Sequence, residues 1–352
     1  MQLQDYVVQN AARRLLANPA ATLEGWTCSQ TGFTPVNPAT GGIYRVQGTV
    51  AGRPWSMLTK VPQISENSPD DETHWNYWKR EVLFYQSGLD QLLPAGTRAP
   101  GFGGTAADSN GQLVFFMEDV PNCTTEPWPV SWHATLARCL AQFNASPAPT
   151  PALPWLCTGW LRGVMRIGLA GLQMADKYQV WELLPAVRAA FPPELVGRIH
   201  RLAAESPRLL GELDAMPTGM MHTDTHQGNV MTVLTATGEP EFVLIDWTSV
   251  GPGAMGEEIG HQFGANVTAG HVPLSQAAEV KEAIIAGYLS GLEQTDEAQV
   301  RRAFIITAAL RGVLFNLMLP MPTLATAPVP VASEIAERLG RAADMLLADA
   351  GF

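Results

Sequence analysis

The spacing of apolar residues divides the chain into a first third rich in strands and a remainder rich in helices. Apolar positions recur with helical spacing over residues 6–18. The runs 43–50 and 53–61 are short enough for strands, and Ala51 and Gly52 between them favour a tight turn. We therefore expect a helix followed by an antiparallel hairpin.

Two further segments complete the first third. Residues 74–86 carry aromatic and apolar side chains at positions i, i+3 and i+4, which predicts an amphipathic helix. The run LVFFMEDV at 113–120 is apolar, ends in acidic residues and is followed by Pro121. It therefore predicts a buried strand that stops abruptly, and the character of the chain changes there.

From residue 132 onward the spacing is helical, with one strand-like island at 219–246. A sheet-rich part, a connecting strand and a helical part with an embedded hairpin predict an α+β fold with two lobes. The expected lobes are residues 1–120 and 121–352, with the boundary near 118–123. The helices expected towards the end of the chain are 274–293, 297–318 and 331–349.

Composition and charge narrow the class of protein. Hydrophobic residues make up 46% of the chain and charged residues 16%, which is typical of a soluble globular enzyme. The formal net charge of -11 argues against a nucleic-acid partner, whose phosphates require a basic surface, and favours a small cationic partner. The N-terminus lacks the apolar core of a signal peptide, and no stretch offers about 18 uninterrupted apolar residues. We therefore expect a cytoplasmic protein that does not bind membranes; the sequence carries no signal for its oligomeric state.

The segment HTDTHQGNV at 222–230 carries the strongest chemical pattern. Phosphoryl transfer needs a carboxylate beside the attacking hydroxyl and a metal ion held against the nucleotide phosphates. Asp224 and Asn229 share a polar loop, in which Asp224 can take the proton of a substrate hydroxyl while Asn229 binds the metal ion. The two strands predicted next return Asp246 to the same side as a second metal ligand, and oxygen ligands of this kind suit Mg²⁺.

Two other functions stay open at this point. His222 and His226 flank Asp224, so these three side chains are candidate ligands of a metal-dependent hydrolase. The remaining histidines show no paired spacing that would complete a zinc site. The second alternative is a catalytically silent nucleotide-binding scaffold, and the presence of Asp224, Asn229 and Asp246 together argues against it.

The segments HTDTHQGNV, LIDW and GPGAMGEEIG, all within residues 222–260, resemble the aminoglycoside phosphotransferase and choline kinase-like superfamily. The resemblance implies a protein-kinase-like fold in which ATP binds between a small antiparallel-sheet lobe and a larger helical lobe. It also implies Mg²⁺ as the metal ion and a hydroxyl group of a small molecule as the phosphate acceptor. Together with the acidic charge, it favours amino sugars, aminoglycosides and aminoalcohols as acceptors.

The resemblance further implies a lysine on an early strand, and Lys60 is the candidate because no other lysine precedes it. Its side chain would contact the α- and β-phosphates, and Glu81 would pair with it, with Glu72 as the alternative partner. Gly41 and Gly42, in a loop before the hairpin, would let backbone N–H groups approach the phosphates.

The run FFMEDV resembles the hinge of the same superfamily, where backbone groups bind adenine. The carbonyl of Glu118 and the amide of Val120 are the expected contacts. Glu257 and Glu258 stand where relatives often carry an aspartate, and we expect them to support the catalytic loop or to face the substrate.

Overall fold

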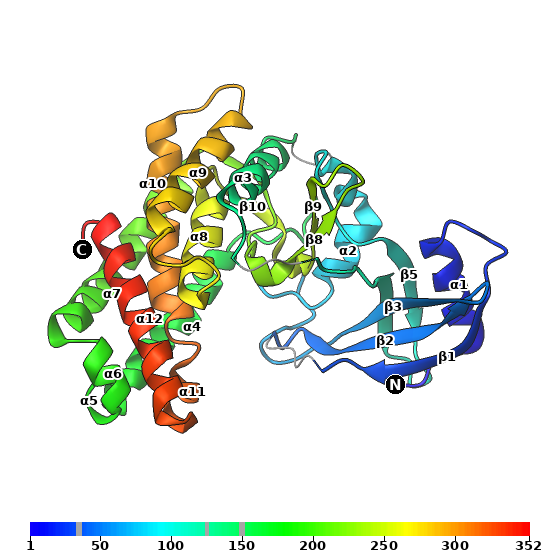
Figure 1. The fold of residues 1–352 in the computed structure, drawn as a ribbon, viewed down its shortest axis with the longest axis horizontal. Helices are drawn as coiled ribbons and strands as arrows, with labels where there is room; N and C mark the ends of the chain where they lie inside the picture. Colours follow the sequence, from blue (N-terminus) through cyan, green and yellow to red (C-terminus); the bar gives the residue numbers. More distant parts are fainter. Residues whose placement is uncertain (33–36, 124–126, 148–151) are drawn as a thin grey trace.

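A five-stranded antiparallel sheet forms one end of the molecule, and helices form the other end (Figure 1). The computed structural model describes residues 1–32, 37–123, 127–147 and 152–352. The predicted α+β fold with a sheet-bearing and a helical part is confirmed. The strands, in their order across the sheet, are β1 (Leu23–Gln30), β2 (Thr40–Val50), β3 (Arg53–Pro62), β6 (Leu113–Glu118) and β5 (Phe102–Ala107).

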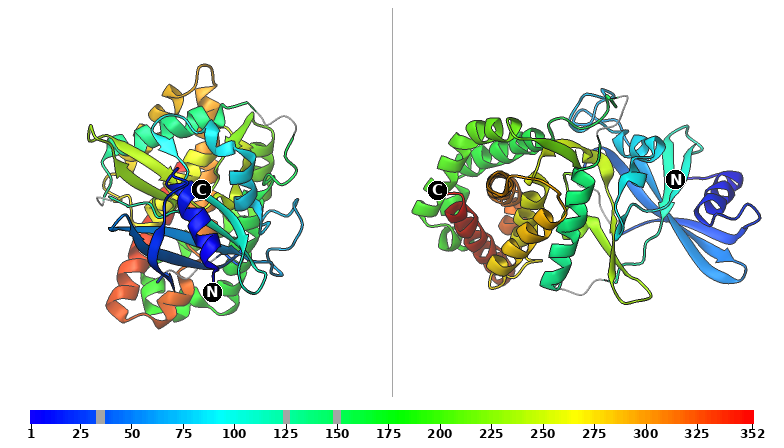
Figure 2. Two further views of the ribbon diagram at one scale, coloured as in Figure 1. Left: turned by 90° about the vertical axis from the view of Figure 1, so that its right-hand side faces the viewer. Right: turned by 90° about the horizontal axis from the view of Figure 1, so that it is seen from above.

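Helix α1 (Asp5–Leu15) covers one face of this sheet (Figure 2). Its buried Val8 shares a small core with Val46 of β2 and Phe116 of β6. The helix expected over 6–18 is thus confirmed, although it ends at Leu15. This small core is separate from the large one, which fills the helical part and also includes Phe115 and Met117 of β6.

The hairpin of β2 and β3 forms as predicted, with Val50 paired to Arg53. Ala51 and Gly52 have φ angles of 49° and 73°, the left-handed values of a turn whose twist matches that of the strands. Lys60 lies on β3, the central strand of the five. Because β3 is hydrogen-bonded on both sides, the backbone that carries Lys60 is held rigidly.

The second helix begins later than its sequence suggests. Periodicity predicts a helix over 74–86, but α2 runs over Arg80–Ser87. The buried guanidinium of Arg80 donates to the carbonyl oxygens of His74 (2.7 Å) and Trp75 (2.9 Å). The prediction is wrong for 74–79. The carbonyl oxygens of this segment accept hydrogen bonds from the buried Arg80 side chain, and the spacing of apolar residues does not reveal such bonds.

A three-stranded sheet lies between the two ends of the molecule (Figure 1). The predicted hairpin within 219–246 is confirmed as β8 (Val230–Leu234) and β9 (Pro240–Leu244). A two-residue strand from the first third, β4 (Thr97–Arg98), pairs in parallel with β9. Strand β4 thus comes before the expected lobe boundary near 118–123, but it belongs to a sheet whose other strands come after that boundary. The division of the chain at this boundary stays a prediction.

The helical part contains all three helices expected towards the end of the chain. Residues 274–293 correspond to α9, 331–349 to α12, and 297–318 divide into α10 and a π-helical segment. A two-stranded sheet of β7 (Thr218–Met221) and β10 (Gly251–Ala254) lies beside them. The helices are α3 (Val130–Asn144), α4 (Trp160–Lys177), α5 (Val180–Leu183), α6 (Pro185–Ala190), α7 (Pro193–Asp214), α8 (Glu257–Ala269), α9 (Ala277–Ser290), α10 (Glu297–Ala309), the π-helical segment (Leu310–Asn316), α11 (Met321–Thr326) and α12 (Val329–Asp349).

The stretch Glu297–Thr326 is long and apolar enough to cross a membrane by length and composition alone. However, 72% of its most apolar window is buried inside the fold. Its apolar side chains therefore mostly belong to the core of the fold.

Three glycines on one face of α8 allow α10 to approach closely. A Cβ atom on Gly260 would lie 2.3 Å from the carbonyl oxygen of Phe304, well inside contact distance. Gly256 and Gly264 meet the backbone of α10 in the same way, one turn before and one turn after. This close approach brings the segment that follows α10 towards the loop at 222–229.

We expect Gly260→Ala to destabilise the protein by about 1–3 kcal/mol, because the added methyl group forces two packed helices apart. Gly211 on α7 is the matched control, since a Cβ atom there meets no atom within 4 Å. Gly211→Ala should stabilise by about 0.5–1 kcal/mol through helix propensity. Denaturant unfolding measures both changes, and equal effects of the two substitutions would contradict the proposed role of the close approach.

Candidate active site

The loop at 222–229 connects β7 to β8 and is held by one buried carboxylate. Glu258, on the first turn of α8, accepts hydrogen bonds from the backbone N–H of His222 (2.9 Å) and of Thr223 (3.2 Å). It also accepts from Oγ1 of Thr225 (2.8 Å) and Nδ2 of Asn144 (2.7 Å). Burial raises the pKa of Glu258, and these donors oppose that rise. The expectation that this residue supports the loop is therefore met by its contacts.

We expect Glu258→Ala to lower the stability of the protein by about 3 kcal/mol or more. It would leave several buried donors without an acceptor, and each such donor costs roughly 1–3 kcal/mol. Thermal unfolding measures the loss. Glu257→Ala is the matched control, because among the described residues Glu257 accepts from one backbone N–H only, that of Ala254 (3.0 Å). If Glu257→Ala costs as much as Glu258→Ala, the loop does not depend on Glu258.

Asp224 lies at the centre of the loop and has partners on both carboxylate oxygens. Its Oδ1 accepts hydrogen bonds from Nη2 of Arg311 (3.0 Å) and from Nε2 of His261 (3.2 Å). Asn229 donates through Nδ2 to the Asp224 backbone carbonyl (3.0 Å) and to Oδ2 (3.3 Å). The carboxylate is thus fixed in orientation while 23% of its side-chain surface stays exposed.

The charges around Asp224 keep it ionised. Burial opposes the charge, but Arg311 and the hydrogen bond from His261 outweigh burial and hold the pKa of Asp224 well below its usual range. Burial and the charge of Arg311 lower the pKa of His261 to about 3, so this imidazole is neutral near pH 7. It therefore donates its Nε2 proton as a neutral tautomer.

Lys60, Glu81 and Asp246 form a charged cluster between β3, α2 and the turn after β9, in which Lys60 and Glu81 are buried and Asp246 is partly exposed. Nζ of Lys60 lies 2.5 Å from Oε2 of Glu81 and 3.0 Å from Oδ1 of Asp246. Burial opposes the charge of Lys60, yet Asp246 and Glu81 together raise its pKa above the ordinary value. Glu81 is thus the partner that Lys60 has in the structure; the alternative, Glu72, is not.

Asp246 has an unusual backbone conformation that aims its side chain at Lys60. Its φ angle is 64°, a left-handed value that aspartate tolerates better than most residues. Behind it, the ring of Trp247 stacks on that of Phe84 of α2, with centroids 4.0 Å apart and planes at 6°. This stacking ties the helix of Glu81 to the turn of Asp246.

The loop at 222–229 and the Asp246 turn are joined through the backbone. Ile245 donates its N–H to the carbonyl oxygen of Asn229 (3.0 Å), and Nε2 of His222 lies 2.8 Å from the carbonyl oxygen of Ile245. Asn229 and Asp246 are therefore neighbours, as the predicted hairpin required. His222 uses its Nε2 for this link and not for a metal ion.

His226 has a local role in the same loop. Its Nδ1 accepts the N–H of Gly228 (3.1 Å), which caps the short 3₁₀ turn Gln227–Asn229. Its Nε2 lies 3.9 Å from Oδ1 of Asp224. Over the described ranges, no three His, Cys, Asp or Glu side chains are grouped so that they could hold a metal ion. These contacts offer no support for a zinc hydrolase built on His222, Asp224 and His226.

Gly41 and Gly42 lie within β2 and not in a loop before it, which corrects the local structure expected for them. The first hairpin is that of β1 and β2, and the pair stands at the start of its second strand, beside Val61 of β3. A Cβ atom on Gly41 would lie 2.6 Å from Oε1 of Gln63. That atom is the end of a flexible side chain that can move, so this contact alone does not require glycine here. The connection to β1 includes residues 33–36, outside the described ranges.

Glu118 ends β6, and Val120 follows two residues later without regular structure. The strand expected over 113–120 is confirmed up to Glu118. The Glu118 side chain pairs with Arg98 at 2.6 Å, which leaves the backbone as the part of this segment that is suited to contact a base.

His261 and Arg311 are the site residues that sequence reasoning missed. They stand 37 and 87 residues after Asp224, and neither belongs to a pattern that marks it as functional. The only signal is composition, because a lone arginine in the apolar run 303–318 needs a buried anionic partner.

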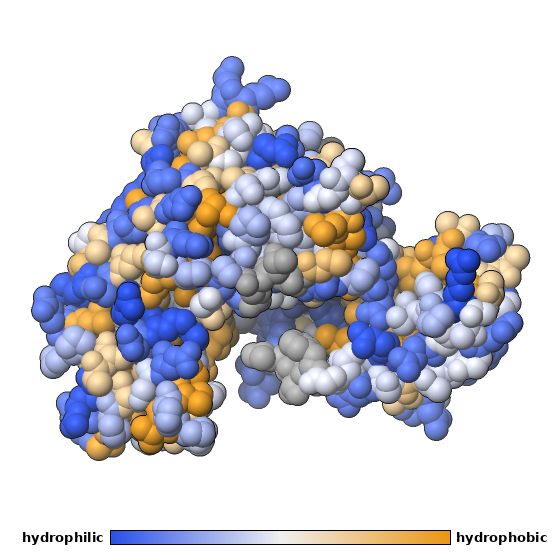
Figure 3. Space-filling view, in the orientation of Figure 1, coloured by the Kyte–Doolittle hydropathy of each residue, from blue (hydrophilic) through white to orange (hydrophobic). Residues whose placement is uncertain are grey.

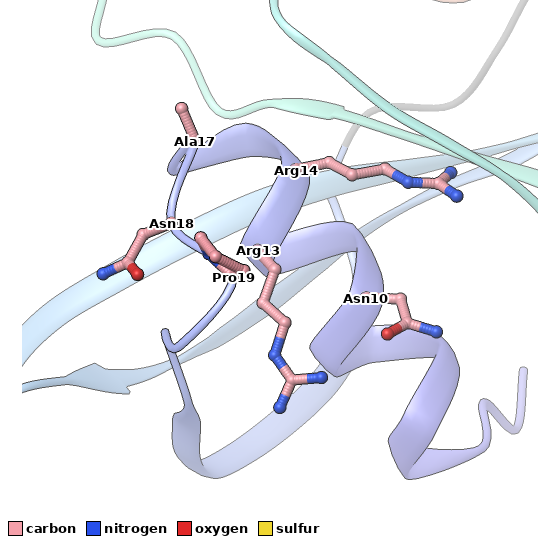
Figure 4. A pocket seen from close by; sticks show the side chains of 6 residues that line it. All are labelled: Asn10, Arg13, Arg14, Ala17, Asn18 and Pro19. Carbon is pink, nitrogen blue, oxygen red and sulfur yellow. The ribbon is translucent and has the colours of Figure 1, made fainter.

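The molecule is hollowed between its helical and sheet-bearing parts (Figure 3). The Lys60 cluster spans these two parts, which places it at their junction. A separate hollow on the outside of α1 contains none of the predicted site residues, and its lining comes from α1 and the turn that follows (Figure 4). Its lining residues are Asn10, Arg13, Arg14, Ala17, Asn18 and Pro19.

Comparison with known proteins adds a family and a fold. Residues 77–301 match the model of the phosphotransferase enzyme family, a span that holds the 222–229 loop and Asp246. No curated protein sequence matches the chain closely enough to be informative.

Several solved structures share the whole fold. An aminopropanol kinase associated with a microcompartment has a TM-score of 0.56 at 14% identity, over 97% of this chain and 96% of that one. A spectinomycin phosphotransferase in complex with ADP and spectinomycin has a TM-score of 0.53 at 14% identity, over 94% of both chains. An amicoumacin kinase in complex with AMP-PNP, Ca²⁺ and Ami has a TM-score of 0.51 at 14% identity, over 90% of both chains. Identities this low establish the fold alone.

Proposed function

The chain belongs to the phosphotransferase enzyme family, and we propose that it transfers the γ-phosphate of ATP to a hydroxyl group of a small molecule. It is thus a small-molecule kinase that acts on an alcohol group. The observation that carries the proposal is that Lys60, Asp246 and the loop of Asp224 and Asn229 meet at one place, although they come from distant parts of the chain.

Asp224 is the proposed catalytic carboxylate. Its Oδ1 is occupied by two strong donors, so Oδ2 is the oxygen left for the acceptor hydroxyl. As the new oxygen–phosphorus bond forms and the bond to ADP breaks, the hydroxyl proton passes to Asp224. A strong base is not needed, because the transition state is loose and the carboxylate chiefly positions the hydroxyl. The lowered pKa of Asp224 is compatible with that role.

Nucleotide binding is assigned to the sheet-bearing part. Lys60 would contact the α- and β-phosphates, with Glu81 fixing its side chain. Backbone groups at Gly41 and Gly42 would cover the phosphates, and a hinge formed by the Glu118 carbonyl and the Val120 amide would bind adenine. In support, ADP and AMP-PNP are bound in two of the solved structures that share this fold.

Asn229 and Asp246 are the proposed ligands of Mg²⁺. The donor set fits a hard cation, because Asn229 donates through Nδ2 and keeps its Oδ1 as a ligand, while Asp246 binds Lys60 and Thr248 through Oδ1 and keeps its Oδ2. A divalent cation bound there would neutralise charge on the transferred phosphoryl group. The amicoumacin kinase complex contains Ca²⁺, which supports a divalent site in this fold.

We propose a cationic acceptor, such as an aminoalcohol, amino sugar or aminoglycoside. The net charge of -11 favours the approach of cations, and the structures of similar fold include an aminopropanol kinase and a spectinomycin phosphotransferase. We also propose a cytoplasmic location, and two lobes made of residues 1–120 and 121–352.

An ATP-consumption assay over a panel of acceptors tests the function. The panel contains aminoalcohols, amino sugars, aminoglycosides, macrolides and hydroxy amino acids, each with Mg²⁺ and with a chelator in excess. We expect one class to stimulate ADP formation, with a phosphorylated acceptor found by mass spectrometry, and the chelator to abolish both. ADP formation that no acceptor stimulates, together with retained zinc, would instead support the metal-dependent hydrolase.

A further inference from the structure

Two buried groups outside the family's sequence signature converge on one oxygen of Asp224. Arg311 is 5% exposed and comes from the segment after α10, and His261 is 1% exposed and comes from α8. Both contact Oδ1 of Asp224, at 3.0 Å and 3.2 Å. The other oxygen, Oδ2, receives only the longer bond from Asn229 among the described residues, at 3.3 Å.

The guanidinium of Arg311 contacts two aromatic rings. Its Cζ lies 5.0 Å from the ring centroid of Trp160 and 4.3 Å from that of Phe315. A guanidinium over an aromatic face gains cation–π attraction, and the two rings fix the plane of the group. Arg311 therefore cannot swing away from Asp224 without losing both contacts.

The backbone around Arg311 is built to bring it into this place. Arg311 lies in the π-helical segment Leu310–Asn316, a form that is rare and frequent at functional sites. Two close backbone approaches pack this segment: a Cβ atom on Gly168 of α4 would meet the Leu314 carbonyl oxygen at 2.1 Å, and one on Gly312 would meet the Gly264 carbonyl oxygen at 3.3 Å. The π-helical segment is thus packed closely between α4 and α8.

We propose that Arg311 and His261 are positioning residues for Asp224: they hold Oδ1, so that Oδ2 faces the acceptor hydroxyl and takes its proton. The proposal rests on the function proposed above. It assigns a role in the reaction to two residues that lie outside the loop and the metal site.

Because the guanidinium of Arg311 is buried, it acts through Asp224 and not on a substrate. Its Nε and Nη1 are enclosed and have no partner among the described residues, so a bound phosphate or carboxylate has no free path to them. Its remaining nitrogen, Nη2, is already bonded to Asp224. The expected effect of removing Arg311 is therefore on turnover and not on substrate binding.

Steady-state kinetics of Arg311→Met tests the proposal. We expect kcat to fall by about 10-fold or more, as for a misplaced reacting group, with KM for ATP and for the acceptor changed by less than about threefold. Adding Arg311→Met to Asp224→Asn should cost little further activity, because an amide at this position cannot take the hydroxyl proton however it is held. A raised acceptor KM at unchanged kcat, or losses that multiply in the double variant, would overturn the proposal.

Thermal unfolding of the same variants tests the pairing independently of any acceptor. Arg311→Met should lower Tm less in the Asp224→Asn background than in the wild type, because the two groups stabilise each other. Additive Tm changes would overturn the proposal whatever the substrate. An inactive wild-type protein with the expected Tm coupling would count against the proposed function alone.

Two further variants test whether a folding defect or a general effect of charge explains the loss of activity in Arg311→Met. Arg311→Lys keeps the charge but loses the planar group, and we expect it to recover part of the lost kcat and Tm. Arg302→Met removes a charge from the preceding helix α10, where Arg302 pairs with Glu212 at 2.6 Å, and should leave kcat unchanged. If Arg311→Lys is no better than Arg311→Met in both kcat and Tm, the charge of Arg311 does not position Asp224.

Discussion

Asp224→Asn is expected to lower kcat by about 10²- to 10⁴-fold, as is typical when a positioned acid–base group is removed, while Mg-ATP still binds. The amide cannot take the hydroxyl proton, and it attracts that hydroxyl less than a carboxylate does. Nucleotide affinity should change little, since Lys60 and Asp246 are untouched. Acceptor-dependent turnover and calorimetric titration with Mg-ATP measure the two effects.

Asparagine is a better test here than alanine because of what lies behind Asp224. Alanine would leave the buried guanidinium of Arg311 without its anionic partner, a loss of about 3–5 kcal/mol in stability that would obscure the kinetics. Asparagine keeps one oxygen for Arg311. Asp214→Asn, which removes the same charge from an exposed pair with Arg162, is the matched control and should leave kcat unchanged. A fully active Asp224→Asn enzyme would falsify the assigned role.

Asp246→Asn is expected to weaken Mg-ATP binding by at least about 10-fold. Removing a residue that only supports a metal ligand typically weakens metal binding by about that factor, and Asp246 is a proposed ligand itself. It removes a negative charge that faces both the metal ion and Lys60, which keeps its bond to Glu81. Asparagine is preferred to alanine, because it tolerates the φ angle of 64° at this position. The affinity is measured by titration with ATP at saturating Mg²⁺.

A chelator provides the control for this second prediction. If Asp246 acts through the metal ion, ATP without a divalent cation should bind the wild type and Asp246→Asn with similar, weak affinity. The difference between the two proteins should return when Mg²⁺ is restored. Equal titrations with Mg-ATP, or a difference that persists in the chelator, would show that Asp246 does not hold the metal ion.

The local sequence was sufficient for the order of elements and for the core of the site. Alternation and turn residues predicted the β2–β3 hairpin that carries Lys60 and the β8–β9 hairpin that returns Asp246 beside Asn229. Such features depend on residues close together in the chain, and binary pattern and turn chemistry record them directly. The catalytic and metal roles of Asp224, Asn229 and Asp246 stay predictions until the variants above are measured.

The sequence-based predictions were wrong or incomplete where residues far apart in the chain contact each other. Helix α2 starts at Arg80 because that buried guanidinium takes the carbonyls of the preceding turns, and it also reaches the carbonyls of Trp155 (2.6 Å) and Thr248 (2.9 Å). Strand β4 pairs with β9, where Thr97 lies opposite Phe242, and the Arg98 to Glu241 ion pair beside it spans 143 residues. No local pattern contains this information.

By itself, then, the sequence determined which residues form the proposed catalytic loop and which strands bring Asp246, the proposed metal ligand, back to it. Tertiary structure alone decided what surrounds Asp224. His261 and Arg311 come from two helices that pack closely only because glycines line the face of α8, and their partner is 37 and 87 residues away. A buried charge is costly without a counter-charge, so the fold had to place Arg311 against a carboxylate, but only packing determined that this carboxylate is Asp224.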